Sequence, residues 1–206
     1  MSDTMTNTTE NTSTNAAVDN TRHAPAHLPG EASMWFFILG DLAIFGVYFI
    51  FYMVYRAQNQ ALFLQSQQHL NQGIGITNTL ILLTSSLFVA LGTQTARDGK
   101  ADAALKLFRL AFAFGLLFPF FKLFEWIPEI SADLTPGTNL FFTYYYVMTG
   151  LHFFHVVLGL AIMAFVMREL RNASTPNITF VETGAIYWHM VDLLWLVLLA
   201  LFYLMR

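Results

Sequence analysis

Five long apolar segments limit what this chain can fold into. Each is long enough to cross the hydrocarbon core of a bilayer, which needs roughly 20 helical residues. The alternating pattern of a transmembrane β-barrel is absent, so helices are the structure that satisfies the backbone hydrogen bonds in lipid. The predicted spans are Ser33–Tyr55, Ile74–Ala96, Ala104–Ile127, Leu140–Met167 and Phe180–Met205. We therefore predict an all-α membrane protein that forms a five-transmembrane-helix bundle.

The composition agrees with a membrane protein and divides the chain into two parts. Hydrophobic residues make up 56% of the 206 residues and charged residues only 11%, whereas soluble domains are about a quarter charged. Residues 1–30 are instead rich in Thr and Asn, and such a stretch cannot bury enough apolar surface to become ordered. We predict a disordered polar tail over residues 1–30 and one transmembrane domain over residues 31–206.

Charge and cysteine content exclude several classes of function. The formal net charge is only −3 and the sequence has no basic run, which argues against a nucleic-acid partner. The chain contains no cysteine. Disulfides, thiolate metal sites, haem attachment through cysteine and cysteine nucleophiles are therefore all excluded.

The positions of lysine and arginine predict the orientation of the helices. Basic residues gather around two of the connections between spans, and they are Arg97, Lys100, Lys106, Arg109, Arg168 and Arg171. The connection between the third and fourth spans contains acidic residues and no basic one. Because cytoplasmic connections carry an excess of basic residues, we expect a cytoplasmic N-terminus and a C-terminus on the periplasmic, outer side.

Ionisable and amide side chains inside the spans are the candidate functional residues. A charged group at the centre of a lone helix costs on the order of 3 kcal/mol to insert, so such groups face a packed interior, pair with one another or meet another subunit. Helical spacing places Glu182 and His189 on one stripe, with Asp192 beside it. We predict a buried polar network that contains Asp41, Asn78, Lys122, Glu125, His152, His155, Glu182, His189 and Asp192.

Several interpretations of this network compete. His152 and His155 with nearby carboxylates could bind a metal, because imidazole and carboxylate suit zinc or iron, and the carboxylates could relay protons. We favour hydrogen bonds between helices, with Glu125, Glu182 or Asp192 as partners of the histidines, because polar residues inside membranes usually pair internally. A membrane metalloenzyme and a transporter are the alternatives. Against a transporter, the spans show no internal repeat and no matched pair of broken helices.

Motifs on the predicted spans can be compared with known families. Phe180–Trp195 is similar to the pattern Phe-Glu-x-x-x-x-Tyr-Trp-His-Phe-Val-Asp-x-x-Trp, with Met190 in place of its second Phe. Thr149–Gly159 is similar to Gly-x-His-x-x-His-Val-x-x-Gly. Further similar stretches are Met34–Phe45, Thr77–Ser85 and Leu123–Trp126. Together they resemble subunit III of the haem-copper oxidases in its five-helix form, over about Gly30 to the C-terminus.

The resemblance implies a non-catalytic membrane subunit of a respiratory haem-copper oxidase in aerobic electron transport. Such a subunit supports the stability and proton uptake of its partner, the catalytic subunit I. Haem and copper are then expected in the partner and no cofactor in this chain, with phospholipid bound in a cleft between helix bundles. Asp41 corresponds to the reactive buried carboxylate of the family, and the other network residues form its internal contacts.

Ligand counting agrees with a non-catalytic role, and the sequence leaves the branch of the family open. The histidines in the spans are His152, His155 and His189, whereas two haems and a copper ion need about six. The stretch from Leu28 to Asp41 looks closest to the NorE-type proteins associated with nitric oxide reductases. An accessory role beside a nitric oxide reductase in denitrification is therefore the alternative function. In either case we expect a multi-pass protein of the bacterial inner (plasma) membrane.

Overall fold

The computed structural model describes residues 32–172 and 176–205, and the regular structure in these ranges is helical. The predicted disordered tail, residues 1–30, lies outside the described residues. The elements are α1 (Ala32–Gln58), α2 (Gln60–Gln67), α3 (Gln72–Arg97), α4 (Ala101–Ser131), α5 (Leu140–Asn172), α6 (Ile178–Leu199) and the π-helix η1 (Ala200–Leu204). Five helices are long and apolar enough to cross a membrane, the last formed by α6 and η1 together. The predicted all-helical, five-span fold is confirmed.

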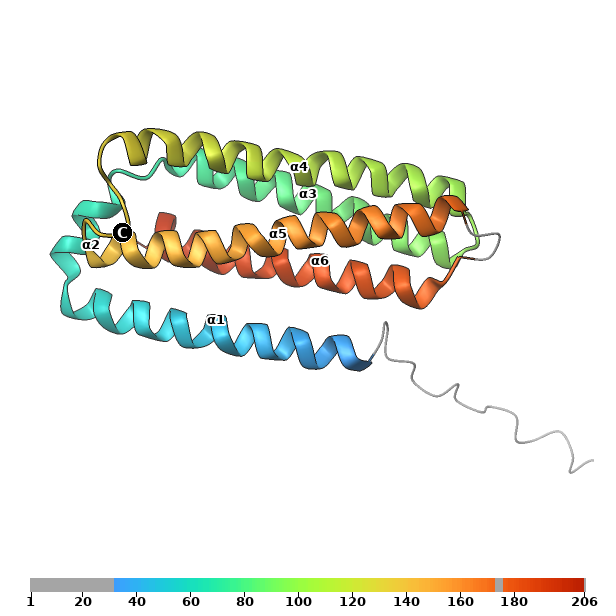
Figure 1. The fold of residues 1–206 in the computed structure, drawn as a ribbon, viewed down its shortest axis with the longest axis horizontal. Helices are drawn as coiled ribbons and strands as arrows, with labels where there is room; N and C mark the ends of the chain where they lie inside the picture. The colour runs from blue at the N-terminus through green and yellow to red at the C-terminus, as the bar shows by residue number, and fades with distance from the viewer. Residues whose placement is uncertain (1–31, 173–175, 206) are drawn as a thin grey trace, which may run out of the picture.

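Helices α3 to α6 form a four-helix bundle, and α1 lies along one side of it, beside α5 and α6 (Figure 1). The two ends of the bundle differ. The basic end holds the α3–α4 and α5–α6 connections, with Arg97 and Arg168 beside them. The C-terminal end holds α2, η1 and the α4–α5 connection (Figure 1).

Asparagine side chains cap the N-terminal ends of two of the membrane-spanning helices. The Asn71 side chain accepts hydrogen bonds from the backbone N–H groups of Gly73 and Ile74 at the start of α3, and Asn177 accepts one from Phe180 at the start of α6. A side-chain oxygen at this position satisfies N–H groups that have no partner within the helix. These caps set where α3 and α6 begin, a few residues before the predicted spans.

The short helix α2 was not predicted from the sequence. Its eight residues bury Phe63, Ser66 and Gln67, and the Ser66 hydroxyl accepts a hydrogen bond from Asn139 of the α4–α5 connection at 3.0 Å. A helix this short is not stable alone. Contacts with the rest of the fold therefore stabilise it.

Two glycines make room for one tryptophan inside the bundle. A Cβ atom at Gly115 of α4 would lie 2.9 Å from the ring of Trp188, and one at Gly159 of α5 would lie 2.8 Å from it. Carbon atoms pack best about 3.5–4.0 Å apart, so neither position accepts a larger side chain unless the ring moves. The glycine at position 159 thus makes room for the Trp188 ring from α6.

Replacing Gly159 by alanine is expected to lower the free energy of unfolding by about 1–3 kcal/mol, as overpacking does in other cores. Trp188 cannot retreat, because Gly115 and its helix lie on the other side of the ring. Gly150→Ala is the matched control in the same helix, since a Cβ atom there meets nothing within 4 Å. Thermal unfolding followed by circular dichroism compares the two variants, and equal midpoints would contradict this account of the packing.

Candidate functional site

Asp41 and His155 join α1 to the bundle. Nε2 of His155 lies 3.1 Å from Oδ2 of Asp41, and Nδ1 of the same ring lies 2.8 Å from the carbonyl oxygen of Leu151. A carbonyl only accepts, so Nδ1 is the donor to Leu151. The contact between Nε2 and Oδ2 joins α1 to α5.

A second ion pair lies toward the C-terminal end of the bundle. Nζ of Lys122 donates to Oε2 of Glu125 at 2.7 Å and to the hydroxyls of Tyr145 and Tyr203 at 2.9 Å each. The Tyr203 hydroxyl donates to Oε1 of Glu125 at 2.6 Å. The Lys122 side chain is fully buried and that of Glu125 is 2% exposed. All three ammonium hydrogens therefore have acceptors, as a buried charge requires.

Aromatic rings complete the surroundings of Lys122. Its Nζ lies 4.7 Å from the ring centre of Tyr145, 5.4 Å from that of Trp195 and 5.5 Å from that of Tyr203. Ring faces attract cations at these distances. The cluster is closed and fully paired, so it stabilises the contact of α4, α5 and η1 and does not resemble an open reaction site.

Three other predicted network residues are buried and form no hydrogen bond of normal geometry with another described residue. Both ring nitrogens of His152, both carboxylate oxygens of Asp192 and both amide atoms of Asn78 lack hydrogen bonds among the described residues. The His152 ring stacks on Trp195, with 5.2 Å between ring centres. The Ser86 hydroxyl lies near the Asp192 carboxylate, although it does not form a hydrogen bond of normal geometry with it. The expected pairing of histidines with Glu125, Glu182 or Asp192 is therefore wrong.

The α3–α6 contact contains the remaining network residues. Nε of Arg97 donates to Oε1 of Glu182 at 2.7 Å near the basic end, and the Ser86 hydroxyl lies 2.6 Å from Nδ1 of His189. The side chain of His189 is exposed, which corrects its predicted burial. Glu182 and His189 lie on the same side of α6, at the edge of its contact with α3. The imidazole ring of His189 is therefore at the surface of the bundle. A hollow of about 400 Å³ separates the two interactions.

Sequence reasoning missed a set of side chains that hold the C-terminal turn, which we name the C-terminal clasp. Backbone carbonyls of η1 and the residue after it, Leu201 to Met205, are its acceptors. Its donors are the side chains of Tyr52, Arg56, Gln67 and Gln72. Gln67 donates to two of the carbonyls, and each of the others donates to one. Helix ends leave carbonyls without partners. These donors come from α1, α2 and α3, so the clasp ties three helices to η1, and neither glutamine stood out in the sequence.

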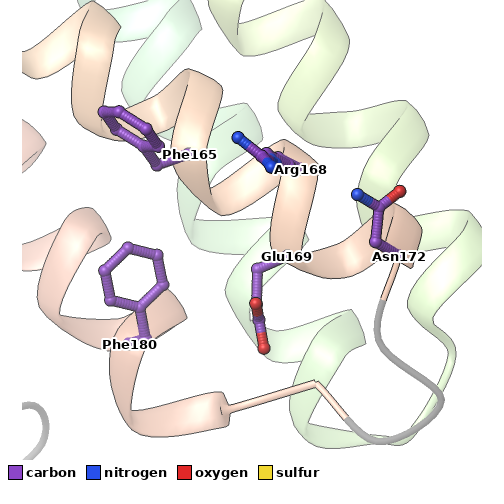
Figure 2. A pocket seen from close by; sticks show the side chains of 5 residues that line it. All are labelled: Phe165, Arg168, Glu169, Asn172 and Phe180. Atoms are coloured by element: carbon purple, nitrogen blue, oxygen red, sulfur yellow. The ribbon is translucent and has the colours of Figure 1, made fainter.

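A second hollow, of about 360 Å³, lies between α5 and α6 at the basic end. Figure 2 shows the rings of Phe165 and Phe180 on one side of it, with Arg168 and Glu169 on the adjoining turn of α5. The carboxylate of Glu169 accepts a hydrogen bond from the backbone N–H of Asn177. The Arg168 guanidinium is exposed beside the apolar rings, a combination that suits an amphiphile with an anionic head.

The site residues do not come together as a metal centre in the part of the chain that the structure describes. No group of three or more His, Cys, Asp or Glu side chains there is arranged to hold a metal ion. The arrangement provides ion pairs and hydrogen bonds between helices. These are interactions that hold helices in fixed positions.

The family model and the similar proteins all indicate the same family. The family described as "Cytochrome c oxidase subunit III" matches residues 31–206. Cytochrome c oxidase subunit 3 of Synechocystis sp. is 31% identical over 172 residues, 82% of this chain and 72% of that protein. Cytochrome c oxidase subunit 3 of Thermostichus vulcanus is 27% identical over 98% of both chains. Heme-copper oxidase subunit I+III of Aeropyrum pernix is 28% identical over 84% of this chain and 22% of its own length.

Proposed function

The chain belongs to the cytochrome c oxidase subunit III family, and from that premise we propose that it stabilises the catalytic subunit of a haem-copper oxidase and supports its proton uptake. Association with a catalytic subunit I and a multi-pass membrane location follow from the family and the five spans. The observation that supports the proposal most is that several polar residues inside the membrane spans bind one another or neighbouring helices. Lys122 and Glu125 of α4 bind the hydroxyls of Tyr145 and Tyr203 on α5 and η1. The Asp41–His155 contact joins α1 to α5.

The fused relative supports subunit I as the partner, because its name places subunits I and III in one protein. Purification of the affinity-tagged chain from gently solubilised membranes is expected to bring down a haem-bearing subunit. The chain alone is expected to show no visible haem spectrum. Stoichiometric haem in the separated chain would overturn the proposal. Stoichiometric zinc, iron, copper or manganese in the separated chain would instead favour the membrane metalloenzyme.

An accessory role beside a nitric oxide reductase is the second candidate, and it differs only in the partner. The similarity of the Leu28–Asp41 stretch to NorE-type proteins is the feature that favours it. The co-purified complex distinguishes the two candidates. Consumption of oxygen with a cytochrome or quinol donor indicates an oxidase, and consumption of nitric oxide without oxygen reduction indicates the reductase.

We also propose a bacterial inner membrane location, with the basic end of the bundle in the cytoplasm. The excess of basic residues at the α3–α4 and α5–α6 connections supports this orientation. Because the chain has no cysteine, single cysteines report the side directly. A cysteine at Asp98 is expected to resist an impermeant maleimide in intact cells, and one at Gly137 in the α4–α5 connection is expected to react. The reverse pattern would overturn the orientation.

Replacing Asp41 by asparagine is expected to lower turnover, or to make it decay sooner, without loss of assembly. The substitution removes the carboxylate that contacts Nε2 of His155, and we expect a two- to tenfold effect, about 0.4–1.4 kcal/mol in the activation barrier. Asp102→Asn, at an exposed position in the first turn of α4, is the matched control. Poor assembly with normal turnover per haem would show that Asp41 is only a structural partner of His155.

We propose that the hollow in Figure 2 binds a phospholipid, with Arg168 at the phosphate and Phe165 and Phe180 beside the acyl chains. Arg168→Gln removes the charge that would attract the anionic head, whose interaction with a basic residue is worth about 1 kcal/mol near a membrane surface. Co-purified phospholipid measured by mass spectrometry is expected to fall. Arg171→Gln, also exposed on the last turn of α5, is the control. Equal lipid content in both variants would contradict this site.

A further inference from the structure

His189 differs from the other ionisable side chains near mid-depth because it faces outward. It lies two residues before the middle of the Ile178–Leu204 span, so its Cα atom is about 3 Å from mid-depth along the helix. The side chain is exposed, and Nδ1 lies 2.6 Å from the hydroxyl of Ser86. No hydrogen bond among the described residues uses Nε2. Ser86 therefore fixes the ring while the second nitrogen is left for a group outside this chain.

Lipid does not supply that group. Acyl chains have no hydrogen-bonding atoms, and head groups begin about 15 Å from the midplane of a bilayer. A polar group transferred into an apolar environment without a hydrogen bond costs free energy. Exposed imidazole at mid-depth thus indicates contact with a polar group carried into the membrane by a protein.

The surface around His189 is shaped for a facing helix. A hollow of about 400 Å³ runs from the basic end to His189. Its lining is polar toward the basic end, where Arg97 and Glu182 lie, and small beside His189, at Ala90 of α3 and Ala185 of α6. Small residues allow a neighbouring helix to approach closely in lipid. This hollow allows side chains of a partner helix to insert between α3 and α6.

The outward faces of α4 and α5 are different. They present large apolar side chains, with Phe120 57% exposed, Phe124 56% exposed and Phe154 61% exposed. Such rings suit contact with acyl chains and offer no polar partner. Exposed leucines also lie on α3, with Leu87 56% exposed and Leu91 42% exposed. The exposed imidazole ring of His189 is therefore what distinguishes the α3–α6 side.

We propose that the catalytic subunit docks on the α3–α6 face, defined by Ser86, Ala90, His189 and Leu193, with the buried Ala185 lining its hollow. A polar side chain of one of the catalytic subunit's membrane helices would then be hydrogen-bonded to Nε2 of His189. This inference rests on the proposed function, which supplies the partner but not the face. Close packing of small residues and interhelical hydrogen bonds are the interactions that associate helices in lipid, and this face offers both.

Site-directed photocrosslinking in the intact complex tests the face. A benzophenone amino acid is placed at Leu193, which is 51% exposed one turn from His189, and in separate chains at Phe124 and Phe154. We expect a crosslink to the haem-bearing subunit from position 193 and none from positions 124 and 154. Crosslinks from position 124 or 154 but not from 193 would overturn the docking face and leave the proposed function intact.

Other outcomes are equally decisive. Adducts from position 193 to lipid, to a small molecule or to a second copy of this chain, with no adduct to the haem-bearing subunit, would also overturn the inference. No crosslink to a haem-bearing subunit from any of the three positions, together with its absence from the purified chain, would overturn the proposed function itself.

Substitution of His189 separates the hydrogen bond from the packing. His189→Leu is expected to weaken retention of the haem-bearing subunit about 3- to 20-fold, the range for one interhelical hydrogen bond. His189→Gln keeps a donor and an acceptor and is expected to recover most of the retention. Both variants should remain monodisperse, because the residue is exposed. Equal retention by wild type and His189→Leu would contradict the hydrogen bond.

Discussion

Replacing Lys122 by methionine is expected to lower the free energy of unfolding by about 3–5 kcal/mol, the usual cost of breaking a buried ion pair from one side. The Glu125 carboxylate would stay buried with the Tyr203 hydroxyl as its remaining donor. The hydroxyls of Tyr145 and Tyr203 would at the same time lose the ammonium group that donates to them. The helices α4, α5 and η1 meet at this cluster, so the effect reaches all three.

The double variant Lys122→Met/Glu125→Leu shows whether the loss comes from the unpaired charge. Apolar replacement of a whole buried pair is often neutral or stabilising, so the double variant is expected to recover more than half of the stability lost by Lys122→Met. Unfolding in increasing dodecyl sulfate, followed by circular dichroism, gives the comparison. A double variant less stable than Lys122→Met would mean that the tyrosine hydroxyls, and not the carboxylate, carry the cost.

Deletion of residues 201–206 is expected to detach α1 from the four-helix bundle. Helix α1 touches the bundle lightly, and the C-terminal clasp joins it there through Tyr52 and Arg56. The deletion removes the carbonyls that these side chains bind, together with the Phe202 ring that lies 4.9 Å from the Tyr52 ring. Of the clasp's contacts with α1 none would remain, and the Asp41–His155 hydrogen bond would still join α1 to α5.

Cysteine labelling measures this detachment, because the chain has no cysteine of its own. Ile38 of α1 is 5% exposed and Val89 of α3 is 1% exposed. A cysteine at Ile38 is expected to react with a membrane-permeant maleimide much faster after the deletion. The deletion also removes the Tyr203 hydroxyl from the Lys122–Glu125 cluster, but that ion pair itself remains within α4. A cysteine at Val89 should therefore stay protected, since α3 and α4 pack along each other. Fast labelling at both positions would mean that the whole bundle unfolds, and unchanged labelling at Ile38 would show that the clasp is dispensable.

The sequence was sufficient for the five spans and insufficient for the contacts between them. Twenty apolar residues without a break identify a membrane helix almost independently of context. Such helices are apolar on every side, so periodicity does not separate the lipid-facing side from the buried side. His189 illustrates the difficulty, because its spacing from Glu182 indicated a shared stripe but not that the stripe lies at the surface.

The partners of the polar residues depend on which helices are neighbours. His155 pairs with Asp41, which is 114 residues away, and no local pattern indicates that α1 lies beside α5. Lys122 and Glu125 are three residues apart on one helix, and that pair could be read from spacing alone. The C-terminal clasp was missed because glutamine and tyrosine are common at helix ends, near the membrane–water interface. Their role as donors to η1 becomes visible only when the position of η1 in the fold is known.

We propose that this chain contributes contacts and support of proton uptake to its complex and no redox centre. The most direct test of this proposal removes the chain from the purified complex and measures haem, copper and turnover in what remains. We expect all haem and copper to stay with the partner, and initial turnover to stay within a factor of about two, or about 0.4 kcal/mol in the barrier. The turnover of the remaining complex should then decay sooner during the assay, and the original decay time should return when the chain is added back. Loss of haem, copper or all initial turnover with the removed chain would contradict the claim.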